Sequence, residues 1–274
     1  MKLTQLIAGA ALAALSSAAS AYNVFPIDGT HSLKWGDNTN GMPGGMVTWS
    51  YIPAGTAGSA YCGTACPGTS VDSIFIENSP GGGFTSTSLT SLESYITAAM
   101  NTWAAAANIT FVKLNSDSGV AINDPAAVPN ATGLIRIGAF DFSSGGGAVG
   151  FAPPPNGGTG SGDILFDSSS FYQFALGNEG DSFSTSFAPN DFESLLLHEL
   201  GHAIGLAHPA VFDPTCPVMA VGGACYPRIN RVLDADDIAG AQFLYGAPVP
   251  EPETYTMLLV GLGLVGFAVR RRVG

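Results

Sequence analysis

The chain has 274 residues and is acidic, because 21 aspartate and glutamate residues against 9 lysine and arginine residues give a formal net charge of −12 at pH 7. This balance argues against nucleic acid as a partner, since a phosphate backbone is bound by basic surfaces. The acidic surplus is compatible with calcium binding, although it is also an ordinary way for a secreted protein to stay soluble. Apart from the two terminal segments described below, the remaining length suffices for one domain rather than two.

The first 21 residues have the pattern of a secretory signal. Lys2 precedes an apolar core, and residues 19–21 are small, as a cleavage site requires. We therefore expect cleavage before Tyr22 and a mature protein outside the cytoplasm. The alternative is a buried N-terminal helix.

The central part of the chain alternates between strand and helix patterns. Residues 47–52 alternate between apolar and polar side chains and stop at Pro53, which predicts a strand. Thr90 and Glu93 have the spacing of a helix capping box, and apolar residues then recur at helical spacing as far as Trp103. Further strands are expected at residues 109–114, 134–138, 148–152 and 163–166.

A second helix is expected to begin near Asn190, which with Glu193 forms another candidate cap just ahead of the apolar residues 195–197. This helix would carry His198 and His202 one turn apart on the same face, where two imidazole nitrogens can be directed at one ion. In the alternative, these are surface or core histidines of an amphipathic helix.

Glu199 and His208 complete the pattern around the two helical histidines. Glu199 is placed to contact a metal-bound water rather than to be a ligand. A straight helix would carry His208 away from the ion, so the chain must turn between His202 and His208, and Gly205 tolerates the positive φ that such a turn needs. Three protein ligands leave one zinc position open for water, as in catalytic sites, whereas structural sites are closed by four.

The HExxHxxGxxH run from His198 to His208, followed by Met219, resembles the metzincin zinc metalloproteases. The resemblance implies that Met219 forms an apolar floor beneath the zinc ligands, whereas ordinary core packing is the alternative. In the serralysin branch a tyrosine follows the methionine by two residues. Val221 occupies that place here, and we assign no catalytic role to Tyr226.

Residues 233–246 are similar to the closing helix of the matrixin branch. Asp236 and Asp237 fall in the first turn of this helix, where they would compensate its dipole. The resemblance implies that one of them also hydrogen-bonds to backbone in the methionine turn. For residues 22–247 it implies an α+β zincin/metzincin catalytic domain, in which a twisted, mostly parallel five-stranded sheet accompanies an active-site helix, a methionine turn and a C-terminal helix.

The chain departs from the animal matrixins at their other metal sites. Gly150 and Leu165 stand where histidines would hold a second, structural zinc ion, so we expect only one zinc ion, the catalytic one. Residues 157–162 and Asp167 resemble the calcium loop of the family, although Ser170 stands in place of its glutamate. Calcium at Asp167 is therefore a second candidate ion, with a solvated loop as the alternative.

The four cysteines fall into two close pairs, and a secretory signal would place them in an oxidising compartment. Cys62–Cys66 and Cys216–Cys225 are the expected disulfides, although three connectivities are formally open. The second pair brackets Met219 and would stiffen the loop beneath the zinc ion. Zinc ligation by Cys62 and Cys66 is the alternative for the first pair.

The C-terminal residues 248–274 resemble the PEP-CTERM sorting signal of Gram-negative bacteria. A Pro-Glu-Pro motif at residues 250–252 precedes an apolar stretch at residues 255–269 and three arginines. The resemblance implies processing by an exosortase-type enzyme, with the arginines kept on the cytoplasmic side. The stretch is short for a permanent span, so transient anchoring is expected, with an ordinary C-terminal anchor as the alternative.

Together these patterns predict an exported, monomeric zinc metalloendopeptidase acting on protein or peptide substrates, at the cell surface or outside the cell. His198, His202 and His208 would hold the ion, and Glu199 would take a proton from a zinc-bound water and pass it to the leaving amine. The resemblance implies that an extended substrate adds to the edge strand at residues 148–152. Two alternatives are a non-catalytic zinc-containing surface or matrix protein and a zinc amidase acting on cell-wall amides.

Overall fold

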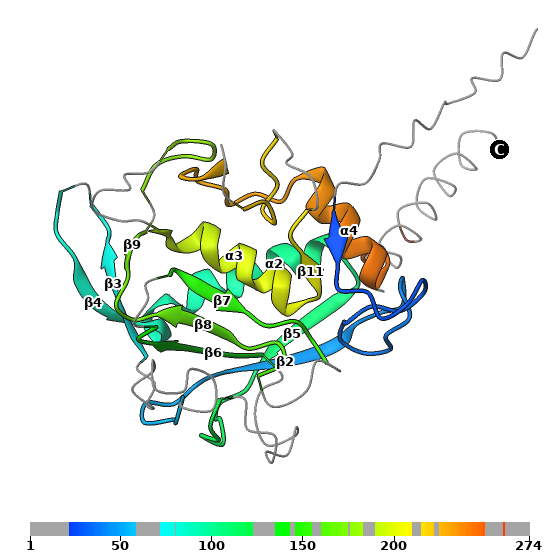
Figure 1. The fold of residues 1–274 in the computed structure, drawn as a ribbon, viewed down its shortest axis with the longest axis horizontal. Helices are drawn as coiled ribbons and strands as arrows, with labels where there is room; N and C mark the ends of the chain where they lie inside the picture. The colour runs from blue at the N-terminus through cyan, green and yellow to red at the C-terminus, as the bar shows by residue number, and fades with distance from the viewer. Residues whose placement is uncertain are drawn as a thin grey trace, which may run out of the picture.

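A computed structural model shows the fold of the central domain (Figure 1). It describes residues 22–58, 72–79, 81–122, 135–142, 146–154, 160–174, 176–182, 190–209, 215–221, 225–249 and 260. The expected signal segment and nearly all of the C-terminal segment therefore lie outside the described residues. Within the described part of the chain, no helix has both the length and the apolar character needed to cross a membrane.

A five-stranded sheet forms the centre of the domain, in the order β5-β2-β6-β8-β7. The first four strands run parallel, and β7 is antiparallel to β8 at the edge, where Ala148 pairs with Phe166. Every residue of β6 is buried, as is usual for a parallel strand covered on both faces. The strands are β2 (Gly45–Tyr51), β5 (Ile109–Lys113), β6 (Ile135–Phe140), β7 (Ala148–Gly150) and β8 (Ile164–Asp167).

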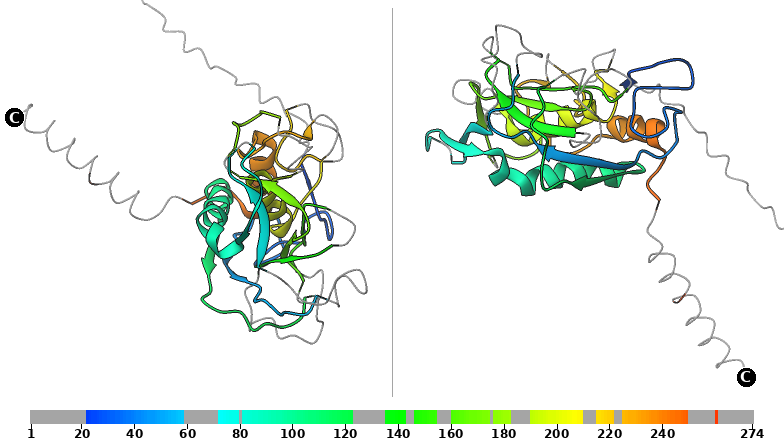
Figure 2. Two further views of the ribbon diagram at one scale, coloured as in Figure 1. Left: turned by 90° about the vertical axis from the view of Figure 1, so that its left-hand side faces the viewer. Right: turned by 90° about the horizontal axis from the view of Figure 1, so that it is seen from below.

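Two helices, α2 (Glu93–Ala106) and α3 (Phe192–Ala203), lie side by side along one face of this sheet (Figures 1 and 2). Trp103 of α2 is fully buried, and its indole Nε1–H donates to the Leu197 carbonyl of α3 at 3.0 Å. The third helix, α4 (Ala235–Tyr245), packs near the end of α3, where the Tyr245 hydroxyl donates to the Ile204 carbonyl. The large hydrophobic core lies between these helices and the sheet.

A second sheet, which the sequence patterns did not predict, has the order β10-β9-β3-β4. Its strands are β3 (Ser73–Glu77), β4 (Thr85–Ser88), β9 (Phe171–Gln173) and β10 (Asn190–Asp191). A further two-stranded pair joins β1 (Asn23–Val24) to β11 (Leu206–Ala207), directly after α3. Because β10 leads into α3, the second sheet fixes the entry to this helix, and β11 fixes its exit.

Both helix starts differ from the predicted ones by a small shift. A short 3-10 helix, η2 (Leu89–Leu92), precedes α2, and its cap is Ser88, whose side chain accepts from the Thr90 N–H. The capping box from Thr90 to Glu93 is therefore wrong, because the extra turn moves the start of α2 beyond Thr90. At α3 the cap is Asp191 rather than Asn190.

The expected α+β class is present, and the predicted strands are found with changed ends. The strand expected at 148–152 ends at Gly150, and the one expected at 134–138 runs instead from 135 to 140. Strand ends depend on which backbone groups of a neighbouring strand are within reach, so the side-chain pattern alone does not fix them.

Candidate active site

The three clustered histidines come from α3 and from the turn that follows it. His198 and His202 lie one turn apart, and the chain leaves the helix at Gly205, which has φ +105°. A Cβ atom at Gly205 would lie 2.2 Å from the Leu33 carbonyl oxygen. Both the positive φ and this close contact favour glycine over every other residue at this position. This turn returns the chain through β11 and places His208 beside the two helical histidines.

Hydrogen bonds to backbone carbonyls orient two of the imidazole rings. His198 Nδ1 lies 2.7 Å from the Val218 carbonyl oxygen, and His202 Nδ1 lies 2.7 Å from the Leu206 carbonyl oxygen. A carbonyl oxygen only accepts, so each Nδ1 carries the proton and each Nε2 presents a lone pair. His208 Nε2 lies 3.2 Å from His198 Nε2 and 2.8 Å from His202 Nε2. The three rings therefore turn their Nε2 atoms toward a common point.

This donor set fits a zinc ion. Zn–N bonds of 2.0–2.1 Å in a tetrahedral site place ligand nitrogens about 3.3 Å apart, close to the two separations observed. Burial lowers the pKa of His198 to about 3 and that of His202 to about 4, so both imidazoles are neutral, as metal ligands must be. Converging lone pairs repel one another unless a cation lies between them, and three protein ligands leave a fourth position for a water or substrate oxygen.

Glu199 lines the same cleft as the three histidines, and the residue is only 5% exposed. Burial raises the pKa of Glu199 to about 7, against a smaller opposing effect from the Gly150 backbone N–H. Strand β7 packs so closely on α3 that a Cβ atom at Gly150 would lie 2.3 Å from the Glu199 carbonyl oxygen. The candidate base is thus held between the helix and the edge strand.

Met219 packs against α3 at Gly201, and Asp237 fixes the turn that contains it. A Cβ atom at Gly201 of α3 would lie 2.1 Å from Met219 Sδ, so the methionine occupies the space a larger residue would need. The Asp237 carboxylate accepts from the N–H groups of Val218 at 2.7 Å and Met219 at 3.0 Å. Burial raises the pKa of Asp237 to about 6. Since Val218 also orients His198, the start of α4 is linked to the histidine cluster.

The neighbouring Asp236 makes a different contact, because its carboxylate accepts from the backbone N–H of Tyr22 at 2.8 Å. The two aspartates implied by the family resemblance therefore divide between two segments. Asp237 holds the methionine turn, and Asp236 holds the first described residue of the chain.

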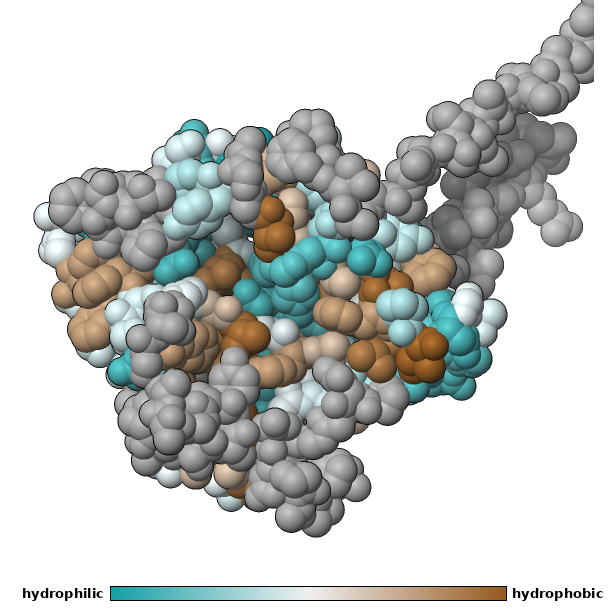
Figure 3. All heavy atoms as spheres, viewed as in Figure 1, coloured by the Kyte–Doolittle hydropathy of each residue, from teal (hydrophilic) through white to brown (hydrophobic). Residues whose placement is uncertain are grey.

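A cleft of about 600 Å³ opens beside the histidines. One wall is formed by β7 and α3, and the other by residues 215–231, called the Met loop below, of which residues 222–224 lie outside the described part. A disulfide joins Cys216 to Cys225 across this loop. On the face that carries β7, Figure 3 shows a hydrophilic band bordered by hydrophobic patches.

The matrixin family profile matches residues 84–246, which is more than half of the chain and includes α2, α3, the Met loop and α4. The chain belongs to the matrixin family. The resemblance inferred from the sequence is confirmed, and membership implies the metzincin fold. A second profile, the PEP-CTERM protein-sorting motif, matches residues 248–272 and indicates export and surface association in Gram-negative bacteria.

Curated relatives of this matrixin are metalloproteinases of animals and plants. Macrophage metalloelastase of Rattus norvegicus is 34% identical over 113 residues, covering 41% of this chain and 21% of the relative. Metalloendoproteinase 2-MMP of Arabidopsis thaliana is 34% identical over 113 residues, covering 39% and 25%. Matrix metalloproteinase-16 of Homo sapiens is 37% identical over 113 residues, covering 40% and 17%. The matched part thus spans a quarter or less of each relative's length.

The candidate calcium residue of this matrixin, Asp167, is buried, and its carboxylate is engaged by the chain itself. It accepts from the Ser169 N–H at 3.0 Å, the Ser169 hydroxyl at 2.7 Å and the Ser170 hydroxyl at 3.0 Å. These bonds favour the loop alternative, in which Asp167 organises a turn. Calcium at this position stays a prediction, and Cys62 and Cys66 lie outside the described residues.

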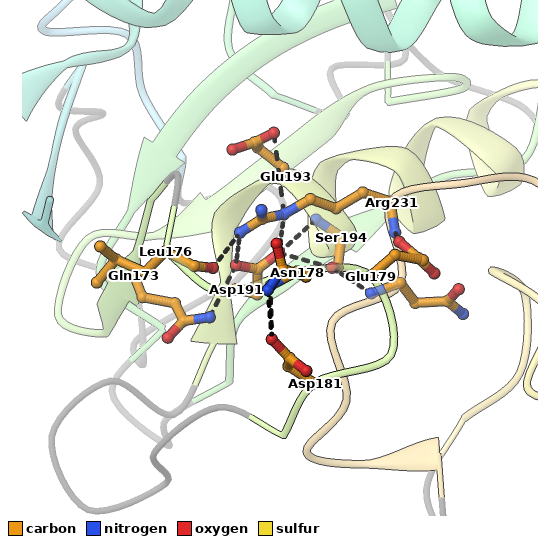
Figure 4. A network of polar contacts seen from close by, with 10 residues as sticks. Gln173, Leu176, Asn178, Glu179, Asp181, Asp191, Glu193, Ser194 and Arg231 are labelled. Carbon is orange, nitrogen blue, oxygen red and sulfur yellow. Dashed lines mark hydrogen bonds and ion pairs between the residues drawn. The ribbon is translucent and has the colours of Figure 1, made fainter. Parts of the chain in front are cut away.

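A polar network at the edge of the cleft was missed by the sequence patterns (Figure 4). Asp191, the cap of α3, binds the guanidinium of Arg231 from the Met loop through both carboxylate oxygens. The Ser194 hydroxyl donates to Asp191 and accepts from the Asn230 N–H. The sequence signal for this network was the presence of two arginines in one loop of a chain with few basic residues. No local pattern, however, indicates which acidic side chain each arginine binds.

Proposed function

We propose that the matrixin domain is a zinc-dependent metalloendopeptidase that hydrolyses peptide bonds. The observation that carries the proposal is the convergence of three histidine Nε2 atoms, two of them held unprotonated by hydrogen bonds at Nδ1, in the same cleft as the buried Glu199. A binding-only site would have no use for a base at that position. The names of the curated relatives support the same reaction class, although only a fraction of their length is matched.

His198, His202 and His208 would hold the zinc ion, and each side chain has a defined task. When bound, zinc would lower the pKa of water and polarise the scissile carbonyl. Glu199 would take the proton of the attacking water and deliver it to the leaving amine, for which a pKa raised toward neutrality suits it. The carbonyls of Val218 and Leu206 would keep the ligand rings in the required tautomer.

An extended substrate would bind along β7. This strand is the edge of the described sheet and lines the cleft with three small residues, Ala148, Val149 and Gly150. An edge strand offers free N–H and C=O groups, so a peptide can add as a further strand. The substrate carbonyl would then pass beside the histidines and Glu199.

The proposal includes the setting of the domain. We propose that residues 1–21 are a signal peptide, that residues 22–247 are the protease domain, and that residues 248–274 are a sorting and membrane segment handled by an exosortase-type enzyme. The domain would act as a monomer outside the cell or at its surface. Mass spectrometry of the secreted protein tests both ends, since it reports a start at Tyr22 and the presence or absence of the tail.

The decisive experiment combines metal analysis with cleavage. The purified domain should bind one zinc ion and cleave a broad peptide library, and a chelator should stop the cleavage until zinc is restored. Glu199→Gln should keep the zinc ion and lower kcat by a factor of about 100 to 10,000. A wild-type protein that holds zinc and leaves all peptides intact would overturn the proposal. Cleavage of peptidoglycan fragments in their place would point to the amidase alternative.

A further inference from the structure

Two arginines of the Met loop, Arg228 and Arg231, lie three residues apart but have different surroundings. Arg231 donates to both carboxylate oxygens of Asp191, donates to the Leu176 carbonyl at 3.0 Å, and lies 3.8 Å from the Glu193 carboxylate. Figure 4 shows its guanidinium directed into this acidic cluster. The charge of Arg231 is therefore balanced within the protein.

Arg228 has no such partner in the described part of the chain. It lines the active-site cleft, and it makes no hydrogen bond or ion pair through its guanidinium with any described residue. The guanidinium lies over Gly180, where a Cβ atom would be 3.1 Å from one terminal nitrogen. Glu179 and Asp181 flank this glycine, but their carboxylates accept from the Arg231 N–H and from Asn178.

The backbone around Arg228 is fixed on both sides. Ile229 exchanges two hydrogen bonds with the preceding loop, donating to the Asp181 carbonyl at 2.8 Å and accepting from the Gly180 N–H at 2.9 Å. Asn230 donates from its side chain to the Cys216 carbonyl at 2.7 Å. The disulfide to Cys225 closes the loop on the other side. The backbone that carries Arg228 therefore loses little conformational freedom when a ligand binds, so only the arginine side chain has to be ordered.

Arg228 differs from the other charged residues that line the cleft. Of the two acids that line it, Asp191 is engaged by Arg231 and Glu199 is the proposed base. Arg228 is the one lysine or arginine among the described lining residues. An arginine that faces a partly desolvated cleft without a partner is suited to bind a carboxylate through two parallel N–H···O bonds.

We propose that Arg228 selects peptide substrates that carry an aspartate or glutamate side chain in this cleft, at a fixed position beside the scissile bond. This inference rests on the proposed function and names the substrate class of the same site. It also assigns the Met loop a role in specificity that none of the histidine-side residues can supply, because those residues contact the peptide backbone or the reacting atoms.

Cleavage-site profiling with C-terminally amidated peptides tests this proposal. Wild-type protein should cleave peptides with an acidic residue at one position beside the cut at least about tenfold faster, in kcat/KM, than the matched glutamine or asparagine peptides, since hydrogen bonds to charged groups are worth that factor. Arg228→Gln should remove the preference, Arg228→Lys should keep part of it, and Arg228→Glu should shift it toward lysine. The matched control is Lys113→Gln, which removes one positive charge from β5, outside the cleft, and should leave the profile unchanged.

A binding measurement separates the failure of this inference from failure of the proposed function. The zinc-loaded Glu199→Gln protein should bind a glutamate peptide about tenfold more tightly than its glutamine analogue, and the added Arg228→Gln change should abolish the difference. If the wild type cleaves nothing, the proposed function fails while this binding comparison still decides on Arg228. Zinc-dependent cleavage without any acidic preference, an unchanged preference in Arg228→Gln, or a preference found only with free C-terminal carboxylates would overturn the Arg228 proposal alone.

Discussion

On the α3 wall of the cleft, the side chains that would perform the chemistry all lie within one short stretch of chain, from His198 to His208. His202 is oriented by the Leu206 carbonyl four residues away, and the turn at Gly205 brings in His208. On the Met-loop wall, Arg228 lies over Gly180, and Arg231 reaches Asp191, 40 residues earlier. The proposed reaction thus relies on residues that are close together in sequence, whereas the proposed substrate selection relies on contacts between segments that are distant in sequence.

Removing a ligand from the α3 wall should have the largest effect. His202→Gln leaves two histidines, so we expect zinc affinity to fall by more than about a hundredfold, beyond the loss typical of changes behind the ligands. Hydrolysis should fall with it. His31→Gln is the matched control, because His31 pairs with Asp28 away from the cluster and should keep full zinc binding. Isothermal titration with zinc measures both, and equal affinities in the two variants would contradict the assigned ligand set.

A backbone change at the end of α3 comes next. Gly205→Ala would require a positive φ and a clash with the Leu33 carbonyl, so we expect it to lower the free energy of unfolding by more than about 3 kcal/mol. Gly55→Ala is the control, since Gly55 has φ +87° but open space around its Cβ position, and it should cost only about 1–2 kcal/mol. Urea unfolding measures both values. Similar losses in the two variants would show that the Leu33 contact is unimportant.

Asp237 links the two walls of the cleft, because it holds the backbone of Val218, whose carbonyl orients His198. Asp237→Asn replaces one acceptor oxygen by a donor that faces buried N–H groups, so a loss of about 2–3 kcal/mol in the free energy of unfolding is expected. Asp236→Asn, in the same turn, keeps a side-chain oxygen that can accept from the Tyr22 N–H and should lose less than about 1 kcal/mol. Thermal unfolding of the two zinc-free variants tests which variant is less stable. A larger loss of stability in Asp236→Asn than in Asp237→Asn would contradict the assigned role of Asp237.

Changes confined to the Met-loop wall should leave zinc binding intact. Replacing both Cys216 and Cys225 by serine should lower stability by about 2–3 kcal/mol, as expected for a short disulfide loop. We expect zinc affinity to stay within a factor of about two, because Asp237 still holds Val218, whose carbonyl orients His198. The preference for acidic peptides should weaken. Loss of zinc together with the disulfide would show that the two walls are not independent.

The smallest expected effect is a pH dependence at Asp237. The pKa of Asp237 is raised to about 6 in the folded protein, so its contribution to stability is complete below pH 4 and is lost as the pH rises through 6. Relative to Asp237→Asn, the wild type should lose about 2 kcal/mol of unfolding free energy between pH 4 and pH 6.5. Urea unfolding of the zinc-free proteins across this range measures the difference, and a gain with rising pH would contradict the sign.

The local character of the α3 wall explains why much of it could be predicted. The positions of His198 and His202 on one face, the need for a turn at Gly205 and the place of Met219 follow from helical geometry and a known motif. The helix caps were missed by one or two residues, because serine, threonine, aspartate and asparagine cap almost equally well and several of them adjoin each helix start.

The rest of the cleft depends on pairings that no local pattern records. Strand β3 pairs in parallel with β9, almost a hundred residues later, and β10 has only two residues. Such short strands carry too few side chains for an alternating pattern to be recognised. Without the second sheet, the positions of Asp191, and so of Arg231, could not be inferred. The distinction between the paired and the unpaired arginine therefore emerges only in three dimensions.

The close packing of Gly150 on the backbone of Glu199 has a consequence for laboratory evolution of this matrixin. Any side chain at position 150 would push the substrate-binding strand away from the helix that carries the proposed base, so this position offers no route to altered selectivity. We expect libraries that vary Gly150 to return mostly inactive proteins. Libraries that vary the Met loop around Arg228 change a wall that holds no metal ligand, and they are the ones from which new specificities can be recovered.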